Sequence, residues 1–283
     1  MQSFEERQEF DGQHEPRSRF ASKVGEKAEL TITKFDKDTK FCQEKSNETP
    51  RFAWNDLRMG KLLGKGGFNS VFEVYIPTKT IQEERNEDDM SSSGESKTME
   101  GPYAIKSLLH SIKCHRQSFL AGAVDLVYEA KLLSVLNHDN IIKVHGLPSA
   151  SIAESYLGGG YFIILDRLAG TLESKIDAWK NHLDSSDMSA PSNYGSQKQK
   201  MLSLDSQQHI DYRLEYVAIP VAEAMKYLHS NHVIFRDLKP SNIGFNEYGT
   251  VKLFDFGLAR EITDPTRLLT GCTGSRRYFA ENK

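Results

Sequence analysis

The stretch Val233-Ile-Phe-Arg-Asp-Leu-Lys-Pro-Ser-Asn242 is followed shortly by a second one, Leu253-Phe-Asp-Phe-Gly257. The first stretch offers a carboxylate at Asp237, an ammonium group at Lys239 and a carboxamide at Asn242. The second adds another carboxylate on a short hydrophobic segment that ends at a glycine. Carboxylate and amide oxygens are good ligands for Mg²⁺, and a cation offsets phosphate charge. Together the two stretches indicate a site that handles a metal-bound phosphate.

The composition is that of an ordinary soluble protein. Charged residues make up 27% of the 283 residues and hydrophobic residues 38%, so one large domain or two lobes can form. A formal net charge of −3 argues against a nucleic-acid-binding surface. The three cysteines lack the spacing of metal ligands or disulfides, which is typical of reduced intracellular thiols. With no signal peptide and no run near the ~18 apolar residues of a membrane span, we expect an intracellular, cytoplasmic protein with no membrane partner.

Three polar stretches are predicted to lie outside the folded core. Residues 1–50 are mixed in charge and poor in periodic apolar positions. Such a segment cannot bury enough apolar surface to offset its ordering entropy, so we predict a disordered N-terminal tail, with a docking segment as the alternative. Order is expected to begin near Phe52-Ala-Trp-Asn-Asp56. Residues 81–101 and 184–207, approximately, are predicted to be solvated inserts.

A glycine cluster lies upstream between two β-prone runs, Leu57 to Leu63 and Gly64-Lys-Gly-Gly-Phe-Asn-Ser-Val-Phe-Glu-Val-Tyr75. This pattern predicts a hairpin with a flexible tip, where backbone N–H groups could approach an anion without a Cβ in the way. A later strand pattern, Pro102-Tyr-Ala-Ile-Lys106, would direct its lysine into a cleft. Apolar residues at 124, 127, 128, 132, 135 and 136 then predict one face of a helix, bordered by Glu129.

These parts occur once each and in a fixed order: the glycine cluster, Ala-Ile-Lys, the helix glutamate, Arg-Asp-x-Lys-x-x-Asn and Asp-Phe-Gly. From about Leu57 to Ala280 the chain resembles eukaryotic-type protein kinases. Lys239, two residues after the aspartate, and Thr273-Gly-Ser-Arg-Arg-Tyr278 resemble the Ser/Thr or tyrosine-kinase-like group. A dinucleotide-binding dehydrogenase is set aside, because β-prone residues follow the glycines where that family opens a helix.

The resemblance implies an α+β, bilobal protein-kinase-like fold over residues 57–283. A small β-rich N-lobe would span about 57–165, and a helical C-lobe would span 169–283. Strands before and helices after Gly170 fit this division. A long helix is expected at 211–230, where Pro220 should kink it or mark a late start.

The resemblance also implies a site for ATP. The glycine loop would cover the phosphates, and Leu165 would guard the back of the pocket. Backbone groups of Asp166 and Leu168 would hydrogen-bond the adenine edge. The residues assigned to ATP are Leu63, Gly64, Lys65, Gly66, Gly67, Phe68, Asn69, Ser70, Val71, Ala104, Lys106, Asp166 and Leu168.

Catalytic roles follow from the same resemblance. Lys106 would bind the α- and β-phosphates while pairing with Glu129, which holds the helix in its active position. Asp237 would accept the proton of the substrate hydroxyl, and Lys239 would steady the γ-phosphate. The implied catalytic residues are Lys106, Glu129, Asp237 and Lys239, and the implied ligands of Mg²⁺ are Asn242 and Asp255.

Three positions depart from the family pattern. Asn69 replaces the third glycine of the loop, and asparagine tolerates positive φ, so the turn is expected to survive with a slightly less flexible tip. Phe235 replaces the usual histidine, and its ring could pack under the phenylalanine of Asp-Phe-Gly. Gly244 stands where a leucine usually lies beneath the adenine, which is expected to loosen nucleotide packing.

The final residues, Tyr278-Phe-Ala-Glu-Asn-Lys283, stand where the family has Ala-Pro-Glu followed by more helices. We therefore expect a C-terminally truncated kinase with an incomplete helical C-lobe and an exposed apolar face on the helix at 211–230. A natural short form acting through a regulatory partner is the alternative. The leading hypothesis is an ATP-dependent Ser/Thr kinase of protein substrates. The second is a catalytically impaired nucleotide-binding or regulatory module.

Overall fold

The computed structural model describes residues 17–38, 49–78, 98–109, 116–151, 154, 161–186, 208, 210–262 and 273–278. Most of both expected inserts, at 81–97 and 187–207, lies outside the described residues, as does the end of the chain from 279. None of the described helices has the length and apolar character of a membrane span.

The strands are β1 (Arg51–Phe52), β2 (Arg58–Lys65), β3 (Asn69–Pro77), β4 (Met99–Leu108), β5 (Val144–Pro148), β6 (Phe162–Leu165), β7 (Gly170–Thr171), β8 (Val233–Ile234), β9 (Ile243–Phe245), β10 (Val251–Leu253) and β11 (Arg260–Glu261). The helices are α1 (Arg17–Asp38), α2 (Arg116–Val135), α4 (Leu172–Ser186) and α6 (Ile219–Ser230). Shorter turns are η1 (Trp54–Asp56), η3 (Leu214–Ala218), η4 (Pro240–Asn242), η5 (Phe256–Leu258) and η6 (Arg276–Tyr278).

The first lobe is a six-stranded sheet in the order β1-β5-β6-β4-β3-β2. Its pairs are antiparallel except β1 with β5, which is parallel. One apolar cluster lies on the sheet around Val74, Ile105 and Phe162. Trp54 packs edge-on against Phe162, with ring centroids 5.5 Å apart, so the residues predicted to begin the ordered domain do pack on the sheet, although α1 precedes them. The larger cluster joins the sheet to α2 and to the second lobe.

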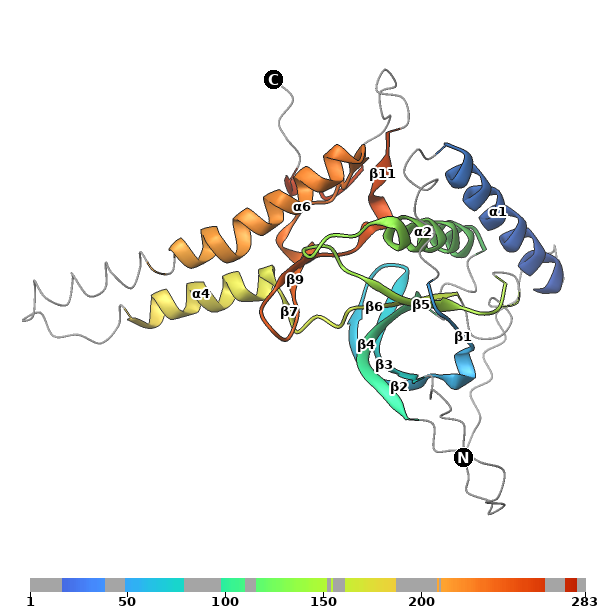
Figure 1. The fold of residues 1–283 in the computed structure, drawn as a ribbon, viewed down its shortest axis with the longest axis horizontal. Helices are drawn as coiled ribbons and strands as arrows, with labels where there is room; N and C mark the ends of the chain where they lie inside the picture. Colours follow the sequence, from blue (N-terminus) through green and yellow to red (C-terminus); the bar gives the residue numbers. More distant parts are fainter. Residues whose placement is uncertain are drawn as a thin grey trace, which may run out of the picture.

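The second lobe begins at β7 and contains α4, α6 and two small sheets, β10-β9-β7 and β11-β8 (Figure 1). Arg213, just before η3, stacks over the ring of Trp179 on α4 at 4.4 Å. The β-rich first lobe and the helical elements after it confirm the α+β fold that the sequence predicted. The long helix exposes apolar side chains, although not on a single face as expected: Ile210, Leu214, Tyr216 and Ile219 are between 47% and 54% exposed.

Pro220 lies in the first turn of α6, and the residues before it form the π-helical turn η3. Proline has no N–H to donate, and its ring collides with the carbonyl four residues earlier in a regular α-helix. A wider π turn relieves that collision. The predicted disturbance of this helix is therefore confirmed, and it takes the form of a π turn.

The predicted disordered tail is wrong for residues 17–38, which form α1. Phe20, Val24 and Ala28 are spaced four residues apart, and all three are buried in the same core cluster as α2. Figure 1 shows α1 beside α2. The average polarity of the first 50 residues concealed this stripe, and the surface that covers it comes from a distant part of the chain.

Candidate active site

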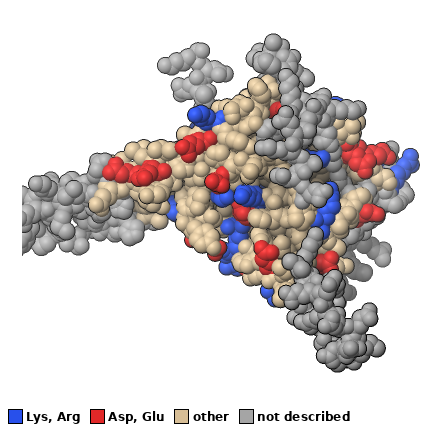
Figure 2. All heavy atoms as spheres, viewed as in Figure 1, with Lys and Arg blue, Asp and Glu red and all other residues tan. Residues whose placement is uncertain are grey.

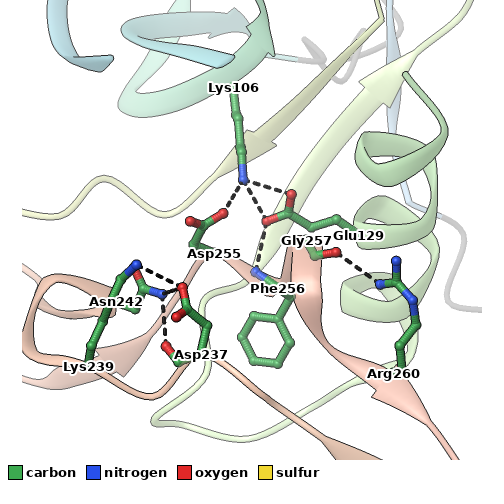
Figure 3. Close-up of polar contacts among 9 residues, drawn as sticks. All are labelled: Lys106, Glu129, Asp237, Lys239, Asn242, Asp255, Phe256, Gly257 and Arg260. Carbon is green, nitrogen blue, oxygen red and sulfur yellow. Dashed lines mark hydrogen bonds and ion pairs between the residues drawn. The ribbon is translucent and has the colours of Figure 1, made fainter. Parts of the chain in front are cut away.

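Lys106 on β4 lies at the centre of a buried ionic cluster (Figure 3). Its Nζ is 2.9 Å and 2.7 Å from the two carboxylate oxygens of Glu129 on α2, and 2.7 Å from Oδ1 of Asp255. The Lys106 and Glu129 side chains are 9% and 2% exposed, whereas Asp255 is 48% exposed. The predicted pair of Lys106 and Glu129 is therefore formed, and Asp255 joins it from the solvent side.

The charges of this cluster depend on one another. Burial alone would lower the pKa of Lys106, but the carboxylates of Glu129 and Asp255 outweigh it and raise that pKa above its ordinary value. Burial raises the pKa of Glu129, against the opposing effect of the Lys106 ammonium. Lys106 is consequently held as a cation, and the loss of either carboxylate would leave a buried charge partly uncompensated.

Asp255 adopts a left-handed backbone conformation, with φ 64° and ψ 67°. Such a conformation is costly for a residue with a Cβ and persists where the surroundings enforce it. The next residue, Phe256, donates its backbone N–H to Glu129 Oε1 at 3.1 Å. Its ring packs edge-on against Phe235, with centroids 4.8 Å apart. The expected packing of Phe235 under the phenylalanine of Asp-Phe-Gly is therefore confirmed.

The catalytic loop is held by bonds that converge on Asp237. Its Oδ2 lies 2.8 Å from Lys239 Nζ and accepts a 2.9 Å bond from Asn242 Nδ2, which also donates to the Asp237 carbonyl. Oδ1 accepts the backbone N–H of Ser275 at 2.9 Å, and the Ser275 hydroxyl accepts from Lys239. The predicted residues are thus brought together, and Ser275 is added to them.

Sequence reasoning flagged the segment around Ser275 only for its resemblance to the Ser/Thr group. The contact between Ser275 and Asp237 joins residues 38 positions apart. No spacing rule predicts that contact. Burial alone would raise the pKa of Asp237, but hydrogen bonds from Lys239 and Ser275 outweigh it and lower that pKa. The carboxylate is therefore ionised at neutral pH, as a proton acceptor requires.

The glycine cluster forms the tip of the β2–β3 hairpin. The Gly66 N–H donates to the Asn69 carbonyl at 2.8 Å, which closes the turn. A Cβ added to Gly64 or Gly67 would meet nothing within 4 Å, so these backbones lie open for a ligand to approach. In register with β4, Val71 stands opposite Lys106, on the same face of the sheet.

The turn forms with Asn69 in place of a glycine, and Asn69 does so without a positive φ. Among the described residues other than glycine, positive φ occurs at His232, Arg236 and Asp255. Asn69 instead begins β3 in register with Leu108. Its Oδ1 is buried without a hydrogen-bond partner among the described residues.

The segment that links the lobes is anchored by Asp166. Its carboxylate accepts the Lys143 N–H at 3.0 Å and lies 2.7 Å from His145 Nε2. Burial alone would raise the pKa of Asp166, but these bonds lower it. The Asp166 N–H already donates to the Lys143 carbonyl at 3.1 Å, so its own carbonyl is what remains for an adenine edge. Sequence reasoning assigned Asp166 only a backbone role and missed its side chain.

Gly244 on β9 is closely covered by Leu168. A Cβ at position 244 would come within 2.6 Å of Leu168 Cδ1 and 3.2 Å of the Phe254 ring. The space that a leucine at this position would fill is thus taken by Leu168 from the linking segment. The expectation that Gly244 loosens nucleotide packing stays a prediction, while the protein itself is tightly packed at this position.

The donor set suits Mg²⁺ bound together with phosphate. Asn242 uses its amide nitrogen for Asp237, which leaves Oδ1 available. Asp255 uses Oδ1 for Lys106, which leaves Oδ2 on a half-exposed side chain. No group of three or more His, Cys, Asp or Glu among the described residues could hold a metal alone. Mg²⁺ commonly takes one or two protein oxygens and completes its shell with phosphate and water, so the two residues fit it.

Charged side chains of both signs lie on the surface of the described residues. Figure 2 shows Lys and Arg side chains near the middle of the face in view, with acidic side chains beside them. The geometry therefore offers a buried cation, two oxygen ligands and an oriented carboxylate under a glycine-rich hairpin. Such a set can bind a polyphosphate and accept a proton from a nearby hydroxyl.

Comparison with known proteins agrees with this chemistry. The protein kinase domain family matches residues 91–282, which begins downstream of the glycine hairpin. A probable serine/threonine-protein kinase, mkcB of Dictyostelium discoideum, is 27% identical over 72% of the chain and 20% of its own length. The probable serine/threonine-protein kinase PBL20 of Arabidopsis thaliana is 28% identical over 77% of the chain and 44% of its own length.

A shorter match has a higher identity. The mitogen-activated protein kinase HOG1 of Eremothecium gossypii is 49% identical over 24% of the chain and 14% of its own length. The chain thus spans less than half the length of these curated relatives. The family match covers well over half of the chain, from 91 to 282. The chain therefore belongs to the protein kinase family.

Proposed function

We propose that the protein transfers the γ-phosphoryl group of ATP to serine or threonine hydroxyls of a protein substrate. The observation that carries the proposal is the pairing of Lys106 with Glu129 and Asp255, at 2.7–2.9 Å, next to the bonded loop of Asp237. An intracellular location and a protein substrate are parts of the same proposal, supported by family membership and by the names of the relatives.

Asp237 is the proposed proton acceptor. Its Oδ2 faces Lys239 and Asn242, and its Oδ1 faces the Ser275 N–H, so its orientation is fixed before any substrate binds. A positioned carboxylate of lowered pKa remains ionised and can take the hydroxyl proton as the oxygen attacks phosphorus. Lys239 is placed to offset charge on the transferred group.

Lys106 is the proposed ligand of the α- and β-phosphates. Because Glu129 and Asp255 hold its ammonium in place, it can meet an anionic oxygen with little reorganisation. Mg²⁺, held by Asn242 and Asp255, would supply positive charge that offsets the phosphates. The linking segment and Leu168 are proposed to contact the base, with Val71 and Ala104 on its other side.

Radiolabelled ATP offers a direct test. Purified protein is incubated with Mg²⁺ and either a Ser/Thr peptide library or a Tyr peptide library. We expect label on Ser/Thr peptides and about a 10²–10³-fold loss in Lys106→Met, as for removal of a single charge-stabilising donor. Lys61→Met removes an exposed lysine from β2 and should retain wild-type transfer.

Three results would contradict the proposal. Label on Tyr peptides alone would refute the substrate class. Calorimetric binding of Mg·ATP without transfer to any peptide would instead establish a nucleotide-binding regulatory module. Unchanged transfer in Lys106→Met would show that the site is wrongly assigned.

A further inference from the structure

Helix α2 is buried on two sides. One side carries Glu129, which reaches Lys106. Successive residues of an α-helix are rotated by about 100°, so the neighbouring Ala130 begins a second side roughly a quarter turn away. That second side carries, at helical spacing, side chains that are at most 2% exposed: Phe119, Ala123, Leu126 and Ala130.

Helix α1 carries a matching apolar stripe. Phe20, Val24 and Ala28 are 6%, 0% and 0% exposed, and they belong to the same core cluster as α2. The rings of Phe20 and Phe119 lie 6.5 Å apart between centroids, so the stripe meets the second side of α2. Leu30, on another side of α1, is 59% exposed. A helix with one buried stripe is stabilised mainly by the surface that the stripe covers.

A third set of contacts reaches α2 from the segment after Asp255. Besides the Phe256 N–H on Glu129, the Glu261 N–H donates to the Tyr128 hydroxyl at 3.3 Å. Asp125 lies 3.3 Å from Arg260. The position of α2 therefore depends jointly on the sheet, on this segment and on α1.

We infer that α1 positions the Lys106–Glu129 pair, an inference that rests on the proposed function. Without α1, the Phe119 side of α2 would be exposed to water, at a cost proportional to its apolar area. The helix could rebury that side only by rotating or shifting, which would withdraw Glu129 from Lys106. By thermodynamic reciprocity, a nucleotide that favours the intact pair strengthens the docking of α1. Phe20, Val24 and Ala28 are thus positioning residues that act through α2.

A charged substitution in the stripe tests the inference on the full chain. Val24→Asp places a carboxylate in the α1–α2 contact without altering α2 or the active site. The matched control, Leu30→Asp, also replaces an aliphatic side chain by a carboxylate, but at an exposed position of α1. We expect Val24→Asp to lower kcat/KM on the Ser/Thr peptide library by about threefold to thirtyfold, the range seen for mutations that couple to a site without touching its ligand. Leu30→Asp should match wild type.

Hydrogen exchange and calorimetry provide readouts that do not require turnover. In Val24→Asp, amides of α2 should exchange faster and the Kd for Mg·ATP should rise, while amides of β9 and β10 keep their protection. Unchanged exchange in α2 would overturn the inference, and so would faster exchange with an unchanged Kd. If Val24→Asp loses protection throughout the chain, the milder Val24→Ala is judged by the same criteria. Should the wild type bind Mg·ATP but transfer no phosphate, the proposed activity fails while these readouts still decide the role of α1.

Discussion

The catalytic loop and the α1–α2 contact serve one active site but are built in opposite ways. Asp237, Lys239 and Asn242 lie within six positions, and their bonds to one another are local. Phe20 and Phe119 meet from distant parts of the chain, and neither belongs to a motif. The chemistry of the loop therefore depends on the spacing of a few residues in the sequence. The effect of the helix pair depends on how distant side chains pack together. The two regions should fail differently when altered.

The largest effect is expected in the loop. Asp237→Asn keeps the shape of the side chain but removes the proton acceptor, so transfer should fall by about 10²–10⁴-fold. Mg·ATP affinity should change little. The free energy of unfolding should fall by about 1 kcal/mol, because Lys239, Asn242 and Ser275 all donate to Asp237 and the NH2 group of the new amide cannot accept from them. Rate, calorimetric and denaturation measurements check this, with Asp139→Asn as the exposed control. Transfer that falls no more than in Asp139→Asn would show that Asp237 is not the proton acceptor.

A change in the α1–α2 contact should lower the stability of the protein more than it lowers the rate of transfer. Phe20→Ala removes a buried ring from the α1–α2 contact and should lower the free energy of unfolding by about 3 kcal/mol, the usual cost of such a cavity. Leu30→Ala, at an exposed position, should cost less than about 0.5 kcal/mol. Urea denaturation compares the two variants. Equal stability would mean that α1 is not docked in solution.

A smaller effect is expected where Leu168 covers Gly244. Gly244→Leu must displace Leu168 Cδ1, which lies 2.6 Å from the added Cβ, so overpacking should cost about 1–3 kcal/mol and weaken adenosine binding. The double variant Gly244→Leu with Leu168→Ala should recover part of both losses. Additive losses in the double variant would show that the two side chains do not compete for one space.

The smallest effect concerns pH. The pKa of Asp237 is lowered in the folded protein, so its contribution to stability is present above the ordinary aspartate pKa of about 3.9 and disappears as pH falls through the folded-state pKa. Lys239→Met removes one cause of the lowering and should move the acid limb of kcat/KM to higher pH. The free energy of unfolding of Lys239→Met should be lower than that of wild type at neutral pH. The two values should become equal as the pH falls and Asp237 is protonated. An unmoved acid limb would exclude Asp237 as the titrating group.

Much of the site could be predicted because most of its residues lie in short motifs with fixed spacing. The pairing of Lys106 with Glu129, the bonds around Asp237 and the packing of Phe235 on Phe256 all agree with the family pattern. The third contact of Lys106, to Asp255, joins residues 149 positions apart, yet each lies in a motif that marks it. The binding of ATP and Mg²⁺ by these residues stays a prediction.

Other features left no local signal. The role of Ser275 depends on its contact with Asp237, 38 positions earlier in the chain. The position of Leu168, in the linking segment, depends on Gly244 of β9, which leaves space for it. Asn69 needs no positive φ because the residue begins a strand, where its backbone is extended. In each case, a neighbour distant in the chain decided the conformation.

The sequence by itself determined the family, the α+β fold and the order of the catalytic groups, because short motifs carry fixed backbone and chemical requirements. Only the tertiary structure decided that residues 17–38 are a helix. A polar segment with three apolar residues in register gains enough by burial only when α2 is present to cover them. That gain depends on a surface assembled elsewhere in the chain, and no window of local sequence contains it.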